Sequence, residues 1–512
     1  MSFMTRVAIV IGVLAIGLVG LSAGGYTTAV VGLVVGAALL AVPWRSRPMW
    51  SWAALYARRN RPIVSAEPVT VANDRSGGGV RYQDGVAAVA IQLLGKPYSP
   101  TFFTGSTSTQ TRNTIDVRDL LADMHQSLGV TLESLTVISA GARRRSSGDY
   151  PRVYDTLIGT PPYAGQRETW LVIRLHALDN ADALQWRVSV GTMALAAAQR
   201  IAAGLRCRDV RARVATAPDI VELERRMGRA ALESHNQRWR TVRGDGGWLT
   251  TYAYRPRDVT TELLGQAWSL RADGVIQNVT VFPDGEATAT LTVRTPQPPN
   301  TPPSVMLRPL PGEQASAVAA GMCGARPHLR GVPRGALGPH LVIPVGPSGI
   351  LLGKLPTGER LLLPLADPGE FSRVHIAAED SIAKRIIVRA AGAGDRITVH
   401  SSELRRWTSV RMPQIAVTDQ ARPASATTIS VVDGTVNPAP RPNTVVSVGP
   451  PGVTRRGPAD VLIVQTGPAT VEVTIATDVY QVEVELFRAE NRYVSIEPMD
   501  LGPAAPEPAS QR

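Results

Sequence analysis

The feature that most constrains this chain is a long uncharged stretch near its beginning. No Asp, Glu, Lys or Arg occurs from Val7 to Trp44. A helix of that length would reach about 57 Å, which is nearly two crossings of a hydrocarbon core of about 30 Å. Small, polar and aromatic residues at 22–28 favour a turn in the middle of the stretch. The pattern predicts a two-helix transmembrane hairpin within residues 1–44, with helices over about 6–22 and 27–43.

Basic residues flank this stretch and predict its orientation. Arg6 precedes the first helix, and a basic segment without acidic residues follows the second. Lys and Arg beside a membrane span are retained on the cytoplasmic side. We therefore expect a multi-pass protein of the inner (plasma) membrane with both termini cytoplasmic. The basic segment is expected to contact anionic lipids through Arg45, Arg47, Arg58, Arg59 and Arg61.

Glycine spacing in the second apolar segment suggests helix packing. Gly32 and Gly36 lie four residues apart, which is the GxxxG spacing of associating membrane helices. Glycine is common in membrane helices, so this spacing is not specific. A cleaved signal peptide ending near Ala23 is the alternative to the hairpin, but it leaves the second apolar segment unexplained.

Composition excludes several other classes of protein. The chain has two cysteines, no CxxC motif and no His/Cys cluster at ligand spacing, so we expect neither a disulfide framework nor a metal site. The net charge of +12 is spread along the chain apart from residues 45–61, and basic residues do not alternate with aromatic ones. Nucleic acid is therefore not an expected partner.

The remainder of the chain divides by composition into five parts. A basic juxtamembrane segment and linker occupy 45–79, and a domain in which strand and helix patterns alternate occupies 80–295, which predicts an α/β fold. A proline-rich linker follows at 296–303. Many short strand patterns at 304–496 predict a C-terminal α/β or β-rich domain. Three prolines within 503–512 predict that the tail at 497–512 is disordered.

Local periodicity predicts individual elements of the first domain. Val86–Leu94 alternates as a strand, Trp170–Leu178 is a continuous apolar strand, and Thr192–Leu205 is an alanine-rich helix. Gln277–Phe282 and Ala287–Arg294 are separated by a Pro-Asp-Gly-Glu turn and predict a hairpin.

Several short segments, in this order and after the hairpin, match a known family. They are Gly79–Tyr82, Leu135–Arg143, Leu157–Pro162, Glu168–Leu175, Gln199–Ala202 and Arg211–Thr216. Over about residues 1–295 the chain resembles the EccE membrane component of mycobacterial type VII (ESX) secretion systems. The resemblance implies a structural subunit of an inner-membrane complex, assembled with EccB, EccD and the motor ATPase EccC.

The same resemblance implies a glycosyltransferase-like fold without known transferase activity. The acidic pair Asp179 and Asp182 agrees with this, because it lacks the DxD spacing that holds a metal-bound sugar nucleotide. We therefore expect a non-catalytic protein export subunit that needs no cofactor and is not an enzyme.

One segment of the C-terminal domain resembles a phosphate-binding loop. After a strand pattern at 371–377, residues 378–385 have the length and lysine position of G-x-x-x-x-G-K-[ST]. Ala378 and Ala383 replace the glycines, and Arg385 replaces the magnesium ligand. Thr428–Asp433 has the shape of the apolar strand that carries a second, acidic motif. A degenerate P-loop fold is therefore one interpretation, with Lys384 and Asp433 as its candidate nucleotide-binding residues.

Two alternatives stay open for this region. In one, Lys384 is a solvated residue at a helix start in an unrelated β-rich domain. In the other, the chain is a membrane-anchored nucleotide-binding or transferase-like protein that uses 378–385. The nearby Gly346–Ile350 segment fails the nucleophile-elbow pattern at its last position, so we interpret it as a β-turn.

Overall fold

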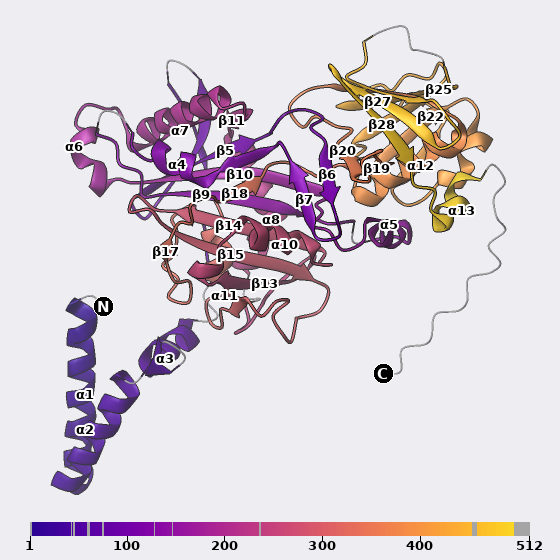
Figure 1. Cartoon of the computed structure of the whole chain (residues 1–512). Helices are drawn as coiled ribbons and strands as arrows, with labels where there is room; N and C mark the ends of the chain where they lie inside the picture. The colour runs from indigo at the N-terminus through magenta and orange to yellow at the C-terminus, as the bar shows by residue number, and fades with distance from the viewer. Residues whose placement is uncertain are drawn as a thin grey trace, which may run out of the picture.

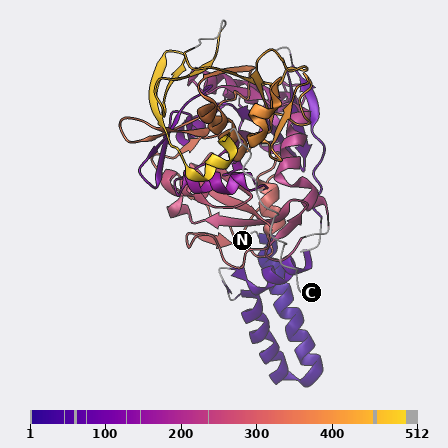
Figure 2. The ribbon, with the colours of Figure 1, turned by 90° about the vertical axis from the view of Figure 1, so that its right-hand side faces the viewer.

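The computed structural model describes residues 3–41, 43–44, 47–58, 62–73, 76–126, 129–145, 147–234, 237–452 and 458–495. Its body is mixed α/β and contains two large sheets, from which a pair of helices projects (Figures 1 and 2). The predicted tail at 497–512 lies outside the described residues.

The projecting pair consists of α1 (Phe3–Gly24) and α2 (Tyr26–Ala41). Gly25 between them has φ +82°, a conformation that favours glycine at this turn. The helices approach closely because a side chain is missing at Gly20, where a Cβ atom would lie 2.6 Å from the carbonyl oxygen of Thr28. The sequence continues through β1 (Pro43–Trp44), β2 (Arg47–Pro48) and α3 (Met49–Arg58).

The predicted transmembrane hairpin is wrong. Within the described part of the chain, no helix has both the length and the sustained apolar character that a membrane crossing requires. The second helix has 16 residues, which at about 1.5 Å per residue gives about 24 Å against a hydrocarbon core of about 30 Å. The predicted multi-pass location in the inner membrane, with both termini cytoplasmic, depended on the same two spans. It is therefore wrong as well.

The first sheet is antiparallel and forms the centre of the N-terminal body. Its main path is β12 (Val242–Gly244), β13 (Gly247–Tyr254), β15 (Glu286–Thr295), β14 (Gly274–Val281), β9 (Ser134–Ala142), β10 (Gln166–His176), β5 (Val86–Leu93), β4 (Gly77–Gln83) and β3 (Val69–Ala72). Short strands extend it: β11 (Ala212–Val214) on β5, β16 (Leu307–Pro309) on β13 and β17 (Gly335–Ala336) on β15. The predicted hairpin at 277–294 is confirmed as β14 and β15.

Helices cover both faces of this sheet. On one face α7 (Val190–Cys207) and α4 (Val117–Asp123) enclose the largest apolar core. On the other face lie α8 (Ala217–Met227), α9 (Arg229–Glu233) and α11 (Gln314–Ala320). Capping boxes fix where α7 and α8 begin, because in each the hydroxyl of Ser189 or Thr216 accepts a backbone N–H three residues on. Small elements at the periphery are η1 (Leu178–Asn180), α6 (Ala181–Leu184), η2 (Pro256–Asp258), α10 (Thr261–Gln266) and η3 (Ala267–Ser269).

The second sheet is half parallel and half antiparallel. Its parallel half is β23 (Ile415–Thr418), β22 (Ile397–Ser401), β24 (Ile429–Asp433), β25 (Thr444–Gly449), β21 (Ser372–Ala377) and β26 (Val461–Gln465). Its antiparallel half continues with β27 (Thr470–Ile475), β28 (Asp478–Val484), β19 (Ile350–Lys354), β20 (Arg360–Leu363), β6 (Thr101–Thr104) and β7 (Ser108–Thr111). The crossover from β21 to β22 is α12 (Asp380–Ala393), and η4 (Leu404–Val410), η5 (Arg488–Glu490) and α13 (Asn491–Val494) complete this half.

The two bodies exchange segments of chain. The N-terminal strands β6 and β7 end the second sheet, and α5 (Tyr150–Ile158) packs on α12 (Figure 1). In return, β8 (Thr114–Asp116) pairs with β18 (Val342–Pro344). The proline-rich residues 296–303 lie between β15 and β16, which both belong to the first sheet. Sequence neighbours are therefore divided between the bodies, and the bodies are bound together by several crossings.

Candidate functional site

The two candidate nucleotide-binding residues meet at one edge of the parallel half-sheet. Asp433 ends β24, and Lys384 lies in the second turn of α12, which follows β21. The carboxyl ends of parallel strands lie at the same edge, so the fold brings the two side chains together. The Lys384 side chain is fully buried, with its Nζ atom 3.7 Å from Oδ2 of Asp380 and 5.8 Å from the ring centroid of Trp407. The alternative of a solvated Lys384 is therefore wrong.

The carboxylates of Asp380 and Asp433 at this edge already accept hydrogen bonds from other side chains of the protein. Asp433 accepts hydrogen bonds from Nη1 of Arg406 at 2.8 Å, from Nε1 of Trp407 at 2.7 Å and from Oγ of Ser401 at 3.0 Å. Arg406 also donates from Nε to both oxygens of Asp380, at 2.9 and 3.0 Å. These bonds lower the pKa of Asp380, and burial lowers the pKa of Lys384. The guanidinium of Arg406 thus stands between the two acids as their counter-ion.

The backbone at 378–385 does not form a phosphate cradle. Only Ala378 and Glu379 separate β21 from α12, so the four residues before Lys384 are already helical. The N–H of Ala378 donates to the carbonyl of Gly449 at 3.1 Å, and that of Glu379 donates to Oε1 of Gln465 at 2.7 Å. A phosphate loop needs these donors free and the backbone wrapped around the ligand. The degenerate P-loop interpretation is therefore not supported.

The other predicted site residues lie near the beginning of the chain. Arg45, Arg59 and Arg61 are outside the described residues. Arg47 lies in β2 and Arg58 ends α3. Gly32 and Gly36 lie in α2 and face Ile16 of α1, where added Cβ atoms would lie 3.1 Å from its backbone oxygen and 3.2 Å from its Cδ1 atom, respectively. These two glycines therefore contact the chain's own first helix.

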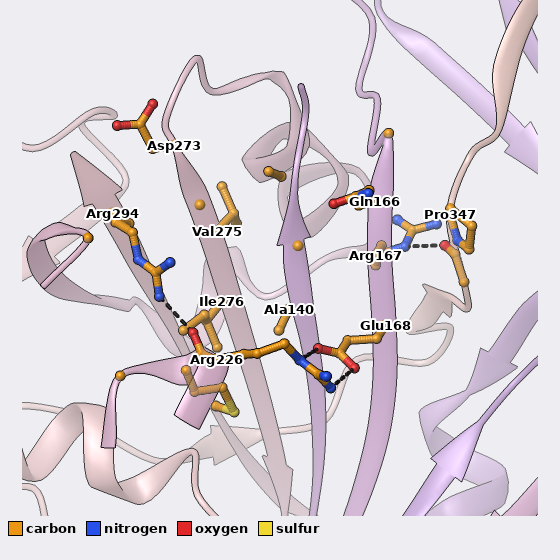
Figure 3. Close-up of a pocket in the computed structure, with 18 of the residues that line it drawn as sticks. Ala140, Gln166, Arg167, Glu168, Arg226, Asp273, Val275, Ile276, Arg294 and Pro347 are labelled. Atoms are coloured by element: carbon orange, nitrogen blue, oxygen red, sulfur yellow. Dashed lines mark hydrogen bonds and ion pairs between the residues drawn. The ribbon is translucent and has the colours of Figure 1, made fainter. Parts of the chain in front are cut away.

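A cleft of about 790 Å³ lies where the first sheet meets the second body. It is lined by the ends of β9, β10 and β14 and by residues 346–350 and 364–368. Figure 3 shows Pro347 of this lining beside Arg167 of β10. The volume is that of a small-molecule site. The sequence did not predict this cleft, because its lining comes from segments more than 200 residues apart.

Arginines line the cleft, and most of them are held by the protein. Arg226 of α8 pairs with Glu168 of β10 through an Nη2–Oε2 contact of 2.8 Å. Arg294 of β15 donates to the carbonyl oxygen of Arg226 at 2.7 Å. Figure 3 shows Arg167 extending from β10 toward the Pro347 segment, where its Nε donates to the carbonyl of Gly346 at 2.6 Å. The Gly346–Ile350 segment is thus part of the cleft wall.

A carboxyl group on the cleft wall gives a testable pH dependence. Burial raises the pKa of Asp395 to about 6, although Oγ1 of Thr428 donates to it at 3.0 Å. The folded state therefore holds this proton between about pH 4 and pH 6 while the unfolded state releases it, so stability falls as pH rises through that window. Asp395→Asn should raise the free energy of unfolding by about 1–2 kcal/mol at pH 8 and leave it unchanged below pH 4. Urea unfolding at both pH values measures this, and an equal gain at pH 3.5 would contradict it.

The chain is similar to known proteins of one family. The family model described as "Putative type VII ESX secretion system translocon, EccE" matches residues 163–254, which run from just before β10 to the end of β13. The ESX-2 secretion system protein EccE2 of Mycobacterium tuberculosis (strain CDC 1551 / Oshkosh) is 50% identical, over 97% of this chain and 97% of its own length. The ESX-1 secretion system protein EccE1 of the same strain is 28% identical over 71% of this chain and 75% of that protein. The ESX-5 secretion system protein EccE5 of Mycobacterium marinum is 29% identical over 32% of this chain and 43% of that protein.

The two-sheet protein with an internally paired acidic site is therefore a component of a type VII (ESX) secretion system. It belongs to the EccE family, which confirms the resemblance inferred from its sequence.

Proposed function

We propose that this protein is a structural, non-catalytic subunit of the ESX complex, which binds other secretion components through the surfaces of its two-sheet body. The partners we propose are EccB, EccC and EccD. The observation that carries the proposal is the Arg406 ion-pair cluster. In a nucleotide-hydrolysing α/β domain, the lysine and the acid at this edge must be available to phosphate and metal. Here both acids already have a cationic partner from the same chain.

Electrostatics favour the paired state of this cluster. A nucleotide at the edge would have to displace Arg406 and leave Asp380 and Asp433 facing a phosphate of the same charge. Removing one partner of a buried or partly buried ion pair leaves its counterpart uncompensated, which costs about 3–5 kcal/mol when the pair is fully buried. The cluster is partly buried, so the cost is smaller but has the same sign. Nucleotide binding is therefore the weaker candidate function, and transferase chemistry has no group in the described residues that favours it.

Two measurements test this proposal. Titration of the full chain with a fluorescent ATP analogue should show no saturable binding at millimolar nucleotide, because the described residues at 378–385 form no free phosphate cradle. Lys384→Met is the matched variant. The non-catalytic proposal would be contradicted if the analogue bound saturably, if unlabelled ATP displaced it, and if Lys384→Met abolished that binding.

Affinity purification of the tagged protein from cells that carry the whole secretion system should recover EccB, EccC and EccD in a fixed ratio. A tagged unrelated protein of equal abundance is the control. Recovery of the tagged chain alone, under conditions in which the other components co-purify with one another, would contradict the assembly role.

A further inference from the structure

Arg167 differs from the other buried arginines of the described chain. Only 9% of Arg167 is exposed, yet no carboxylate of the described residues lies within ion-pair distance of it. By contrast, Arg81, Arg143 and Arg389 each pair with a buried acid. Arg174 lacks an acid but donates to four protein oxygens through all three of its nitrogens.

The side chain of Arg167 is held in one orientation. Its Nε atom donates to the carbonyl oxygen of Gly346 at 2.6 Å, and its guanidinium lies 5.1 Å from the ring centroid of Trp268. The two terminal nitrogens make no hydrogen bond to the described residues and are not sealed from solvent. The protein therefore holds the guanidinium through its Nε atom and through the contact of its planar face with Trp268. The edge that carries Nη1 and Nη2 is left free. That edge is the fork that binds two oxygens of one anion.

Burial of this cation without a counter-ion is costly. Desolvation lowers the pKa of Arg167 to about 9, and no carboxylate offsets that effect. A buried charge is normally paired, because an isolated one loses its hydration without compensation. The side chain also lines the cleft of about 790 Å³, so an anion of small-molecule size has room to reach it.

We propose that this cleft binds a ligand carrying a carboxylate or phosphate group, with two oxygens of that group accepting hydrogen bonds from Nη1 and Nη2 of Arg167. The remainder of the ligand lies along the cleft wall at Gly346 and Pro347, on the face of the sheet to which Arg167 points (Figure 3). The Arg226–Glu168 pair lies on the opposite face, because successive residues of a strand alternate between the two faces. The ligand supplies the negative charge that the chain itself does not place beside Arg167. This site is separate from the Arg406 cluster and does not depend on the proposed assembly role.

Protection from chemical modification tests the site without a substitution. The purified full chain is treated with phenylglyoxal at pH 8 and constant ionic strength, in chloride, in acetate or in inorganic phosphate, and each arginine is followed by mass spectrometry. We expect saturating phosphate or acetate to slow modification of Arg167 at least tenfold. Arg152, which is exposed on α5, is the internal control and should react at the same rate in all three buffers. Stronger protection by phosphate than by acetate would identify a phosphoryl ligand, and the reverse would identify a carboxylate.

A variant gives a second, independent measurement. In the wild-type chain, inorganic phosphate should raise the midpoint of thermal unfolding in a saturable way, and Arg167→Gln should abolish that increase while Arg152→Gln preserves it. No protection of Arg167 in either anion, or equal protection of Arg152, would overturn the proposal. If Arg167→Gln does not fold, the modification experiment on the wild-type chain still decides.

Discussion

Replacing Glu490 with alanine should lower the free energy of unfolding by about 3–5 kcal/mol, because it leaves Arg389 buried without a counter-ion. Both side chains are fully buried. Nε and Nη2 of Arg389 donate to the two carboxylate oxygens at 2.9 and 2.8 Å, and the hydroxyl of Tyr150 donates to Oε1 at 2.7 Å. This carboxylate therefore joins α12, the N-terminal helix α5 and the end of the described chain.

Equilibrium unfolding in urea, followed by tryptophan fluorescence, measures this loss. Glu222→Ala is the matched control, since it removes an acid from the exposed Arg225–Glu222 pair, which solvent screens, and it should lower the free energy of unfolding far less. The effect should also be local, because Tyr150 loses its acceptor: limited proteolysis is expected to cleave near α5 sooner in Glu490→Ala than in Glu222→Ala. A loss in Glu490→Ala no greater than in the control would contradict the role given to this pair.

Glu224→Ala is expected to cost a comparable amount, about 3–5 kcal/mol, in the first body. Glu224 of α8 is fully buried and pairs with both terminal nitrogens of Arg81 on β4, with Nη2 at 2.7 Å from Oε2. The same carboxylate accepts the backbone N–H of Cys323 at 3.0 Å, and Nη1 of Arg81 donates to the carbonyl of Cys323 at 2.6 Å. Three segments separated by up to 242 residues thus share one pair.

Cys323 provides a direct measure of this change. Burial raises the pKa of its thiol to about 12, so it should be inert to thiol reagents in the native protein. In Glu224→Ala, local opening should make it reactive, while the exposed Cys207 reacts equally in both proteins. The double variant Arg81→Met, Glu224→Leu should recover most of the lost stability, because replacing a whole buried pair by apolar groups removes the uncompensated charge. A double variant as unstable as Glu224→Ala alone would contradict this explanation.

Local patterns were sufficient to predict much of the first body. The strand predicted at 170–178 overlaps β10 over residues 170–176. The helix predicted at 192–205 lies within α7, and the predicted turn separates β14 from β15. These predictions depend on side-chain periodicity and on turn residues, which act over a few positions of chain. The membrane hairpin was also inferred from local composition. It is wrong because no helix in the described part of the chain has both the length and the sustained apolar character of a membrane span.

At the candidate site, local sequence patterns did not predict which charged groups pair with one another. The sequence selected Lys384 and Asp433 as candidate nucleotide-binding residues, and the fold places both at one edge of the parallel half-sheet. It did not predict Arg406, which lies in η4 and neutralises both Asp380 and Asp433. The spacing of a phosphate-loop motif therefore pointed to two residues at this edge, but it contained no information about the arginine that pairs with the acids there.

The sequence by itself determined the family, the alternating α/β character of the first body and most of its local elements, since these depend on residues close together in the chain. Only the tertiary structure decided which charges are paired and which are free. Arg389 and Glu490 are 101 residues apart, and Arg167 and Gly346 are 179 apart. Whether a buried guanidinium meets a carboxylate or an open cleft depends on how such distant segments pack, because burial and ion pairing are properties of the folded surface around the side chain.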